Sequence, residues 1–214
     1  MKTKTYLAEF LGSATLLLSV VGSSFMASDL SNDRAIVLLV NALVTAAALS
    51  IIIRLGHKFS GAHFNPAVTL ALFIQGKIAF LTSVKYMFAQ VIGAFTGVVL
   101  ANFMFSDSPL KASEISRTGS QQLLGEVIAT SGLIYLALTL NIKLAWKLIP
   151  LWIFGAYFFT VSTSFANPAV TIARSFTSAP SGIAFESLAG FILVQFFSAA
   201  IVGALFRFSK NRAS

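Results

Sequence analysis

One pentapeptide, Asn-Pro-Ala-Val-Thr, occurs twice in this sequence, at residues 65–69 and again at residues 167–171. Asparagine is a favoured N-cap residue and proline a favoured first helical residue, so each copy predicts the start of a helix. The asparagine amide can also donate hydrogen bonds to a passing molecule. A single copy would be equally consistent with the start of an ordinary amphipathic helix. Two copies at matching places favour a duplicated functional site.

The apolar segments that begin at these motifs, residues 65–75 and 167–177, are too short to cross a membrane. At about 1.5 Å per residue, each helix would span about half of the hydrocarbon core. If the two helices enter from opposite faces, their N-termini meet near the bilayer centre, where each carries about half a positive charge. Irregular backbone at that depth is tolerated where it lines a cavity or is buried in protein. Such a pore would accept neutral hydrogen-bonding molecules and resist cations, including protons.

The composition indicates a membrane protein. Apolar residues make up 57% of the 214 residues, charged residues make up 10%, and the mean hydropathy is +0.85. Soluble domains carry about 25% charged residues. We expect six membrane-spanning helices, at residues 6–27, 35–53, 83–105, 121–140, 146–161 and 183–206. The basic start and the apolar run to Val21 also resemble a signal peptide, but the first span has a counterpart in the second half.

The basic residues are divided unevenly between the two sides of the membrane. With a cytoplasmic N-terminus, four of the 15 basic residues fall outside, at Arg34, Lys111, Arg117 and Arg174. The other eleven fall inside: Lys2, Lys4, Arg54, Lys58, Lys77, Lys85, Lys143, Lys147, Arg207, Lys210 and Arg212. This positive-inside pattern predicts a multi-pass protein of the plasma (inner) membrane with both termini in the cytoplasm. The net charge of +8 therefore orients the chain in the lipid bilayer, and we expect no nucleic-acid partner.

Other polar residues recur in the same order in the two halves. Glu9 lies early in the first expected span and Glu126 early in the fourth, while Gln90 lies in the third and Gln195 in the sixth. Each half holds three spans, an odd number, so the second half must be inverted relative to the first. We expect a single channel domain over residues 1–214, made of inverted repeats at about 1–105 and 121–214 with a linker at 106–120.

These features resemble the aquaporin or major intrinsic protein family over essentially the whole chain. The resemblance rests on Ala-Glu-Phe at 8–10, Gly-Ala-His-Phe-Asn-Pro-Ala-Val-Thr at 61–69, Ala-Gln at 89–90 and Asn-Pro-Ala at 167–169. It implies an all-α membrane protein, a right-handed bundle of six transmembrane helices plus two re-entrant half-helices, which assembles as a homotetramer with a pore in each protomer. The pore motif residues would be Asn65, Pro66, Ala67, Asn167, Pro168 and Ala169.

The activity implied is passive transport of water and small uncharged solutes. No nucleophile–base pair, metal cluster or phosphate-binding loop is evident in the sequence. The chain also lacks cysteine. We therefore expect no enzymatic activity, no catalytic residue, no cofactor and no metal site.

The chain departs from the family in the narrow outer filter. Most members place an arginine directly after the second Asn-Pro-Ala, where this chain has Val170, and counting from the motifs puts the other filter positions at Thr45, Gly155 and Ser164. The implied filter is small, uncharged and wide, which favours glycerol and other polyols or urea in addition to water. Members with valine here resemble prokaryotic channels associated with arsenic resistance, whose neutral trihydroxy arsenite mimics a polyol. A water-selective channel is the alternative.

Arg174 lies four residues after Val170, one turn further along the same helical face. Its guanidinium would either occupy the outer vestibule and repel cations or bind loop carbonyl groups as a structural residue. A unit charge about 4 Å from a passing cation costs it roughly 4 kcal/mol at an effective dielectric near 20. Without the filter arginine, we expect cation exclusion to be weakened but not abolished.

Two interpretations also remain open for three other polar residues, Glu9, Glu126 and His63. Glu9 and Glu126 would either accept hydrogen bonds from the re-entrant loops or form the proton relay of an ion-coupled secondary transporter. Gln90 and Gln195 would make similar polar contacts between helices. His63 would line the cytoplasmic vestibule or bind a loop carbonyl.

Overall fold

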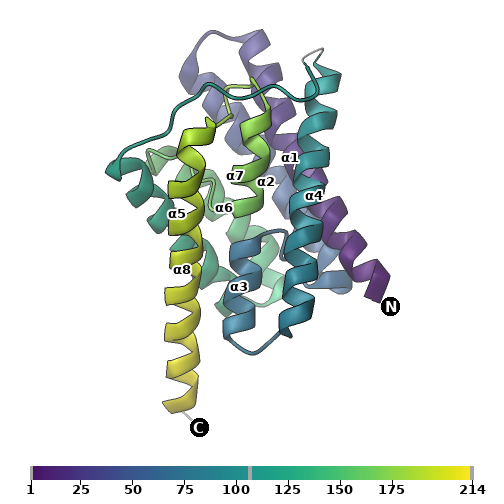
Figure 1. Ribbon diagram of the computed structural model, residues 1–214, viewed down its shortest axis with the longest axis vertical. Helices are drawn as coiled ribbons and strands as arrows, with labels where there is room; N and C mark the ends of the chain where they lie inside the picture. Colours follow the sequence, from purple (N-terminus) through teal and green to yellow (C-terminus); the bar gives the residue numbers. More distant parts are fainter. Residues whose placement is uncertain (1, 106–107, 213–214) are drawn as a thin grey trace.

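The computed structural model describes residues 2–105 and 108–212. These residues form eight α-helices and one short 3-10 helix, without any strand (Figure 1). In the linker expected at 106–120, residues 108–119 run across one end of the molecule to α5, and positions 106 and 107 lie outside the described residues. Residues 1, 213 and 214 also lie outside them.

Six of the helices are long and apolar enough to cross a membrane, with mean hydropathies between 1.3 and 2.7. They are α1 (Lys2–Leu30), α2 (Arg34–Ser60), α4 (Phe80–Met104), α5 (Ser120–Thr139), α6 (Ile142–Phe159) and α8 (Phe185–Arg212). The prediction of six spans is confirmed. The largest difference in their bounds is at α2, which continues from the predicted end at residue 53 to Ser60, where Gly61 adopts the left-handed conformation and caps it (φ 86°).

The two expected half-helices are also present, as α3 (Pro66–Ile74) and α7 (Pro168–Ala173). Both begin as predicted. The side chain of Asn65 accepts a hydrogen bond from the backbone N of Ala67 (2.8 Å), and that of Asn167 accepts one from Ala169 N (3.0 Å). The second half-helix is shorter than predicted, because the chain tightens after Ala173 into the 3-10 helix η1 (Arg174–Phe176).

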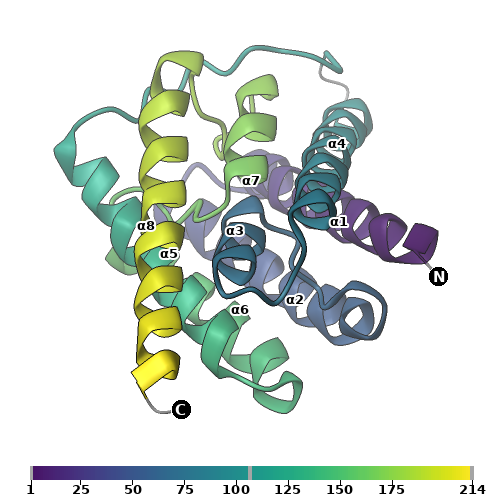
Figure 2. The same ribbon diagram turned by 60° about the horizontal axis from the view of Figure 1, so that its bottom comes forward.

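The long helices surround the half-helices and hold them end to end. Helix α1 packs against α4, α5 packs against α8, and α2 contacts α6. Each half-helix lies against a long helix of the other half, because α3 contacts α8 and α7 contacts α4. Figure 1 shows α7 above α3, and Figures 1 and 2 both show the two half-helices between α4 and α8. The sequence motifs are thereby brought together inside the protein.

Candidate pore and selectivity filter

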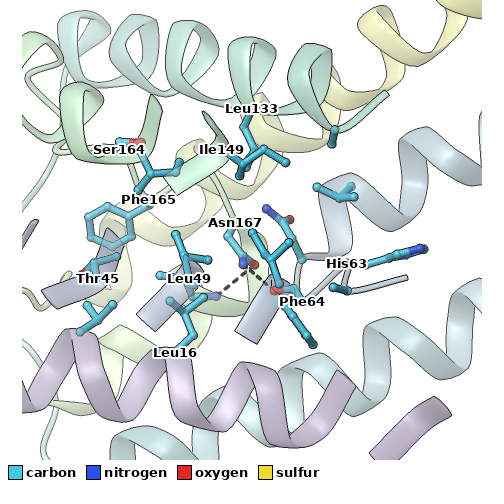
Figure 3. Close-up of a pocket in the computed structure, with 18 of the residues that line it drawn as sticks. Leu16, Thr45, Leu49, His63, Phe64, Leu133, Ile149, Ser164, Phe165 and Asn167 are labelled. Atoms are coloured by element: carbon cyan, nitrogen blue, oxygen red, sulfur yellow. Dashed lines mark hydrogen bonds between the residues drawn. The ribbon is translucent and has the colours of Figure 1, made fainter. Parts of the chain in front are cut away.

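The two motif loops are joined by a reciprocal pair of hydrogen bonds. Nδ2 of Asn65 donates to the carbonyl oxygen of Ala166 (2.7 Å), and Nδ2 of Asn167 donates to that of Phe64 (2.8 Å). Figure 3 shows Asn167 and Phe64 side by side at this junction. Each bond crosses from one half of the chain to the other, so the two half-helices meet N-terminus to N-terminus. Each amide nitrogen keeps a second hydrogen that can reach the adjoining space.

The backbone that leads into the motifs is strained in both halves. Five residues other than glycine have positive φ angles between 48° and 59°: Ala62, Phe64, Thr163, Ser164 and Ala166. The left-handed conformation costs an L-residue roughly 1–2 kcal/mol. Ala62 and Phe64 precede the first asparagine at the same spacing as Ser164 and Ala166 precede the second. Both loops therefore need external support to keep this shape.

In the first half, that support comes from Glu9. Its carboxylate is fully buried and accepts hydrogen bonds from the backbone N of His63 (3.1 Å) and Phe64 (2.7 Å) and from Nε2 of Gln90 (2.7 Å). The same Nε2 atom contacts Oγ1 of Thr69 (3.0 Å). The carboxylate, the loop, α3 and α4 thus form one polar network inside an apolar bundle.

The second half repeats this network around Glu126, which is also fully buried. Its carboxylate accepts hydrogen bonds from the backbone N of Phe165 and Ala166, both at 2.8 Å, and from Nε2 of Gln195 (2.6 Å). Gln195 also contacts Oγ1 of Thr171 (2.9 Å). This geometry favours the loop-supporting role over a proton relay, because the carboxylate oxygens are occupied by loop and glutamine donors.

A narrow cavity of about 70 Å³ runs past the junction. Figure 3 shows Thr45, Ser164 and Phe165 at one end of it, His63 at the other end and Asn167 between them. Its apolar wall comes from the long helices α1, α2, α5 and α6, through Leu16, Val20, Leu49, Ile53, Leu133, Ala137, Ile149 and Ile153. One wall is therefore apolar, while the motif loops supply hydrogen-bonding groups to the other.

The cavity lining on α6 differs at one position from the sequence-based expectation. Gly155 is not among the residues that line the cavity, whereas Ile153 and Tyr157, one helical turn apart, are. A Cβ atom on Gly155 would meet the ring of Phe159 at 3.4 Å. The hydroxyl of Tyr157 lies 3.2 Å from Oγ1 of Thr45. On α6, the cavity is therefore lined by Tyr157 and not by the expected Gly155.

Val170 and Arg174 both line the cavity. Arg174 is only 1% exposed, and its Nε donates to the carbonyl oxygen of Ser181. Its guanidinium carbon lies 3.5 Å from the centre of the Phe165 ring. Arg174 therefore combines both expected features. Its side chain binds a loop carbonyl group, and it also lines the cavity.

His63 lies at the other end of the cavity, with Nδ1 3.0 Å from Oγ1 of Thr69 and its ring centre 4.9 Å from that of Tyr86. Sequence reasoning missed Tyr157 and Phe165 as lining residues. A comparison of the two motif copies could have found Phe165, because it occupies the same place before the second asparagine as His63 before the first.

Six spans, two half-helices that meet at their N-termini and a cavity past that junction define a membrane channel. The chain belongs to the major intrinsic protein family, because residues 1–205 match the sequence profile of the family described as "Major intrinsic protein". It is therefore a channel for water and small solutes and not an enzyme.

Several known proteins are similar to it. The chain is 42% identical over 209 residues to "Aquaglyceroporin AqpS" of Rhizobium meliloti (strain 1021), which covers 96% of this chain and 89% of that protein. It is 32% identical over 136 residues to "Probable aquaporin TIP2-2" of Oryza sativa subsp. japonica, covering 62% and 54% of the two chains. The X-ray structure of the aquaglyceroporin from Plasmodium falciparum matches the fold with a TM-score of 0.67 at 20% identity, over 97% of this chain and 95% of that one.

Replacing Glu126 by glutamine tests how much the second loop depends on its carboxylate. One acceptor oxygen becomes an NH₂ group, which would face a backbone N–H donor or Nε2 of Gln195. We expect Glu126→Gln to lower the free energy of unfolding by about 2–3 kcal/mol, measured by unfolding in mixed detergent micelles. Glu186→Gln, at an exposed carboxylate bound to Ser116, is the matched control. Equal stability of the two variants would contradict the supporting role.

Proposed function

We propose that the protein is a passive channel in which water and small uncharged solutes move past Asn65 and Asn167. The observation that carries this proposal is the cavity with one apolar wall and one hydrogen-bonding wall. A neutral solute can exchange hydrogen bonds with the motif loops while its other side meets no polar group. A cation in the same space would lose most of its hydration without a compensating negative charge, which is costly.

The solutes we propose are water, glycerol and other polyols, urea and neutral arsenite. Thr45, Tyr157 and Ser164 bring three hydroxyl groups to the filter end of the cavity. The buried Ser164 Oγ has no hydrogen-bond partner among the described residues, so it is available to a solute hydroxyl. The name of the aquaglyceroporin relative supports the same class of solute. One observation favours the water-selective alternative, because Tyr157 is bulkier than the glycine expected in the filter.

We also propose the arrangement of the chain in the membrane. The matched networks around Glu9 and Glu126 support inverted repeats at about 1–105 and 121–214 within one domain. The positive-inside pattern supports cytoplasmic termini and a place in the plasma (inner) membrane. A homotetramer is proposed from the family resemblance. The exposed apolar side chains on the long helices, such as Leu43 (59%) and Leu193 (69%), support contact with lipid or with neighbouring protomers.

The solute range is tested by stopped-flow light scattering on proteoliposomes for water and glycerol, together with arsenite uptake by elemental analysis. We expect the wild-type protein to pass all three. Tyr157→Ala removes a ring from the filter and should raise glycerol entry severalfold with little change in water entry. Tyr135→Ala, at an exposed tyrosine on α5, is the matched control. Passage of water alone by the wild-type protein would contradict the polyol proposal and favour a water-selective channel.

Cation exclusion by Arg174 is tested by replacing it with glutamine. In this proposal the guanidinium repels cations at the filter, so Arg174→Gln should raise proton and potassium conductance by up to about three powers of ten. Arg174→Lys should restore exclusion because it keeps the charge. Arg54→Gln removes an exposed positive charge on α2, outside both cavities, and serves as the control. Unchanged ion conductance in folded Arg174→Gln protein, with water flux intact, would refute this role.

A further inference from the structure

A second, larger cavity of about 940 Å³ lies beyond the filter, and Arg174 lines both cavities. We refer to this space as the outer vestibule. Its walls include the C-terminal end of α1, the N-terminal end of α2, the linker and the loop that follows η1. Arg34, Arg117 and Arg174 line the outer vestibule, whereas no aspartate or glutamate among residues 2–105 and 108–212 does. Three of the four basic residues expected outside therefore gather at this one end of the pore.

Two of these arginines lie close together against one aromatic ring. The guanidinium carbon of Arg174 is 3.5 Å from the centre of the Phe165 ring, and that of Arg117 is 5.0 Å from it. The two positive groups are therefore no further apart than the sum of these distances, about 8.5 Å. Nε of Arg117 donates to the carbonyl oxygen of Gly182 (2.9 Å), and Nε of Arg174 donates to that of Ser181. Backbone contacts thus fix two like charges that repel each other.

The charge of this pair is not neutralised by contact with a carboxylate. The oxygens of Glu126 already accept hydrogen bonds from the second motif loop and from Gln195. Among the described residues, the two Nη groups of Arg174 have no protein acceptor. Positive charge and hydrogen-bond donors therefore remain available to a ligand in the outer vestibule.

One unpartnered donor lies at the same place. Oγ of Ser181 is buried, lines the outer vestibule and has no hydrogen-bond partner within the described part of the chain. A buried polar atom without a partner costs free energy, which a bound ligand or water would recover. The hydroxyl of Ser181 can donate to an anion that also contacts Arg174.

We propose that the outer vestibule is a binding site for a small divalent oxyanion of the sulfate type, which plugs the pore when it is bound. Arg174, Arg117 and the Ser181 hydroxyl hold the ion, and Arg34 contributes charge from the rim. A planar guanidinium fork matches the oxygens of such an anion. The bound ion lies across the route to the filter because Arg174 borders both cavities. Small anions in the medium would then regulate solute entry from this side.

Binding is tested with radiolabelled sulfate by equilibrium dialysis of the purified protein in neutral detergent, with chloride added to constant ionic strength. We expect saturable binding that Arg34→Gln weakens about threefold to tenfold, because one charge of three is removed. Arg207→Gln removes one exposed arginine near the C-terminal end of α8, where Nη1 binds Ile74 O, and should leave the affinity unchanged. Absence of saturable binding would overturn the proposal, as would equal weakening by both variants.

The plug is tested separately by stopped-flow water entry into proteoliposomes, with sulfate or chloride on both sides at matched osmolarity and ionic strength. Water entry should fall as sulfate fills the site, and Arg34→Gln should shift the half-inhibiting concentration by the same factor as the binding constant. Saturable binding with unchanged water entry would overturn the plug. Absence of water entry in chloride as well would contradict the channel proposal and leave the binding result standing.

Discussion

The structure depends on holding two short helices end to end inside an apolar bundle. Helices of nine and six residues are too short to be stable alone in water, and their motif loops contain left-handed residues. The reciprocal bonds from Asn65 to Ala166 and from Asn167 to Phe64 join the two loops directly. Each asparagine therefore caps its own helix and also binds the opposite loop. Because the junction needs one such asparagine from each half, the motif occurs twice.

The buried carboxylates and the polar wall of the cavity both depend on that junction. A buried carboxylate is costly, but Glu9 and Glu126 each satisfy two loop N–H groups that could not otherwise be paired in lipid. The loops that they hold supply the polar wall of the cavity, while the long helices supply the apolar wall. A passage for neutral molecules is thus a direct result of how the half-helices are supported.

Features that depend on local sequence were predictable, whereas features that depend on rotation and loop shape were not. Apolar length predicted the spans, and Asn-Pro predicted the starts of α3 and α7, since capping needs only adjacent residues. Counting from the motif predicted Gly155 as a filter residue, whereas Tyr157 is the residue of α6 that lines this end of the cavity. The approach of Arg117 to Arg174 was also unpredictable, because it depends on how the linker crosses the loop after η1.

The most direct test of the junction is a double-mutant cycle of Asn65→Ala and Asn167→Ala, measured as free energies of unfolding in mixed detergent micelles. If the two asparagines act through one junction, the loss in the double variant should differ from the sum of the single losses by about 1 kcal/mol or more. If the losses add to within about 0.5 kcal/mol, each asparagine only caps its own helix, and the reciprocal junction would be contradicted.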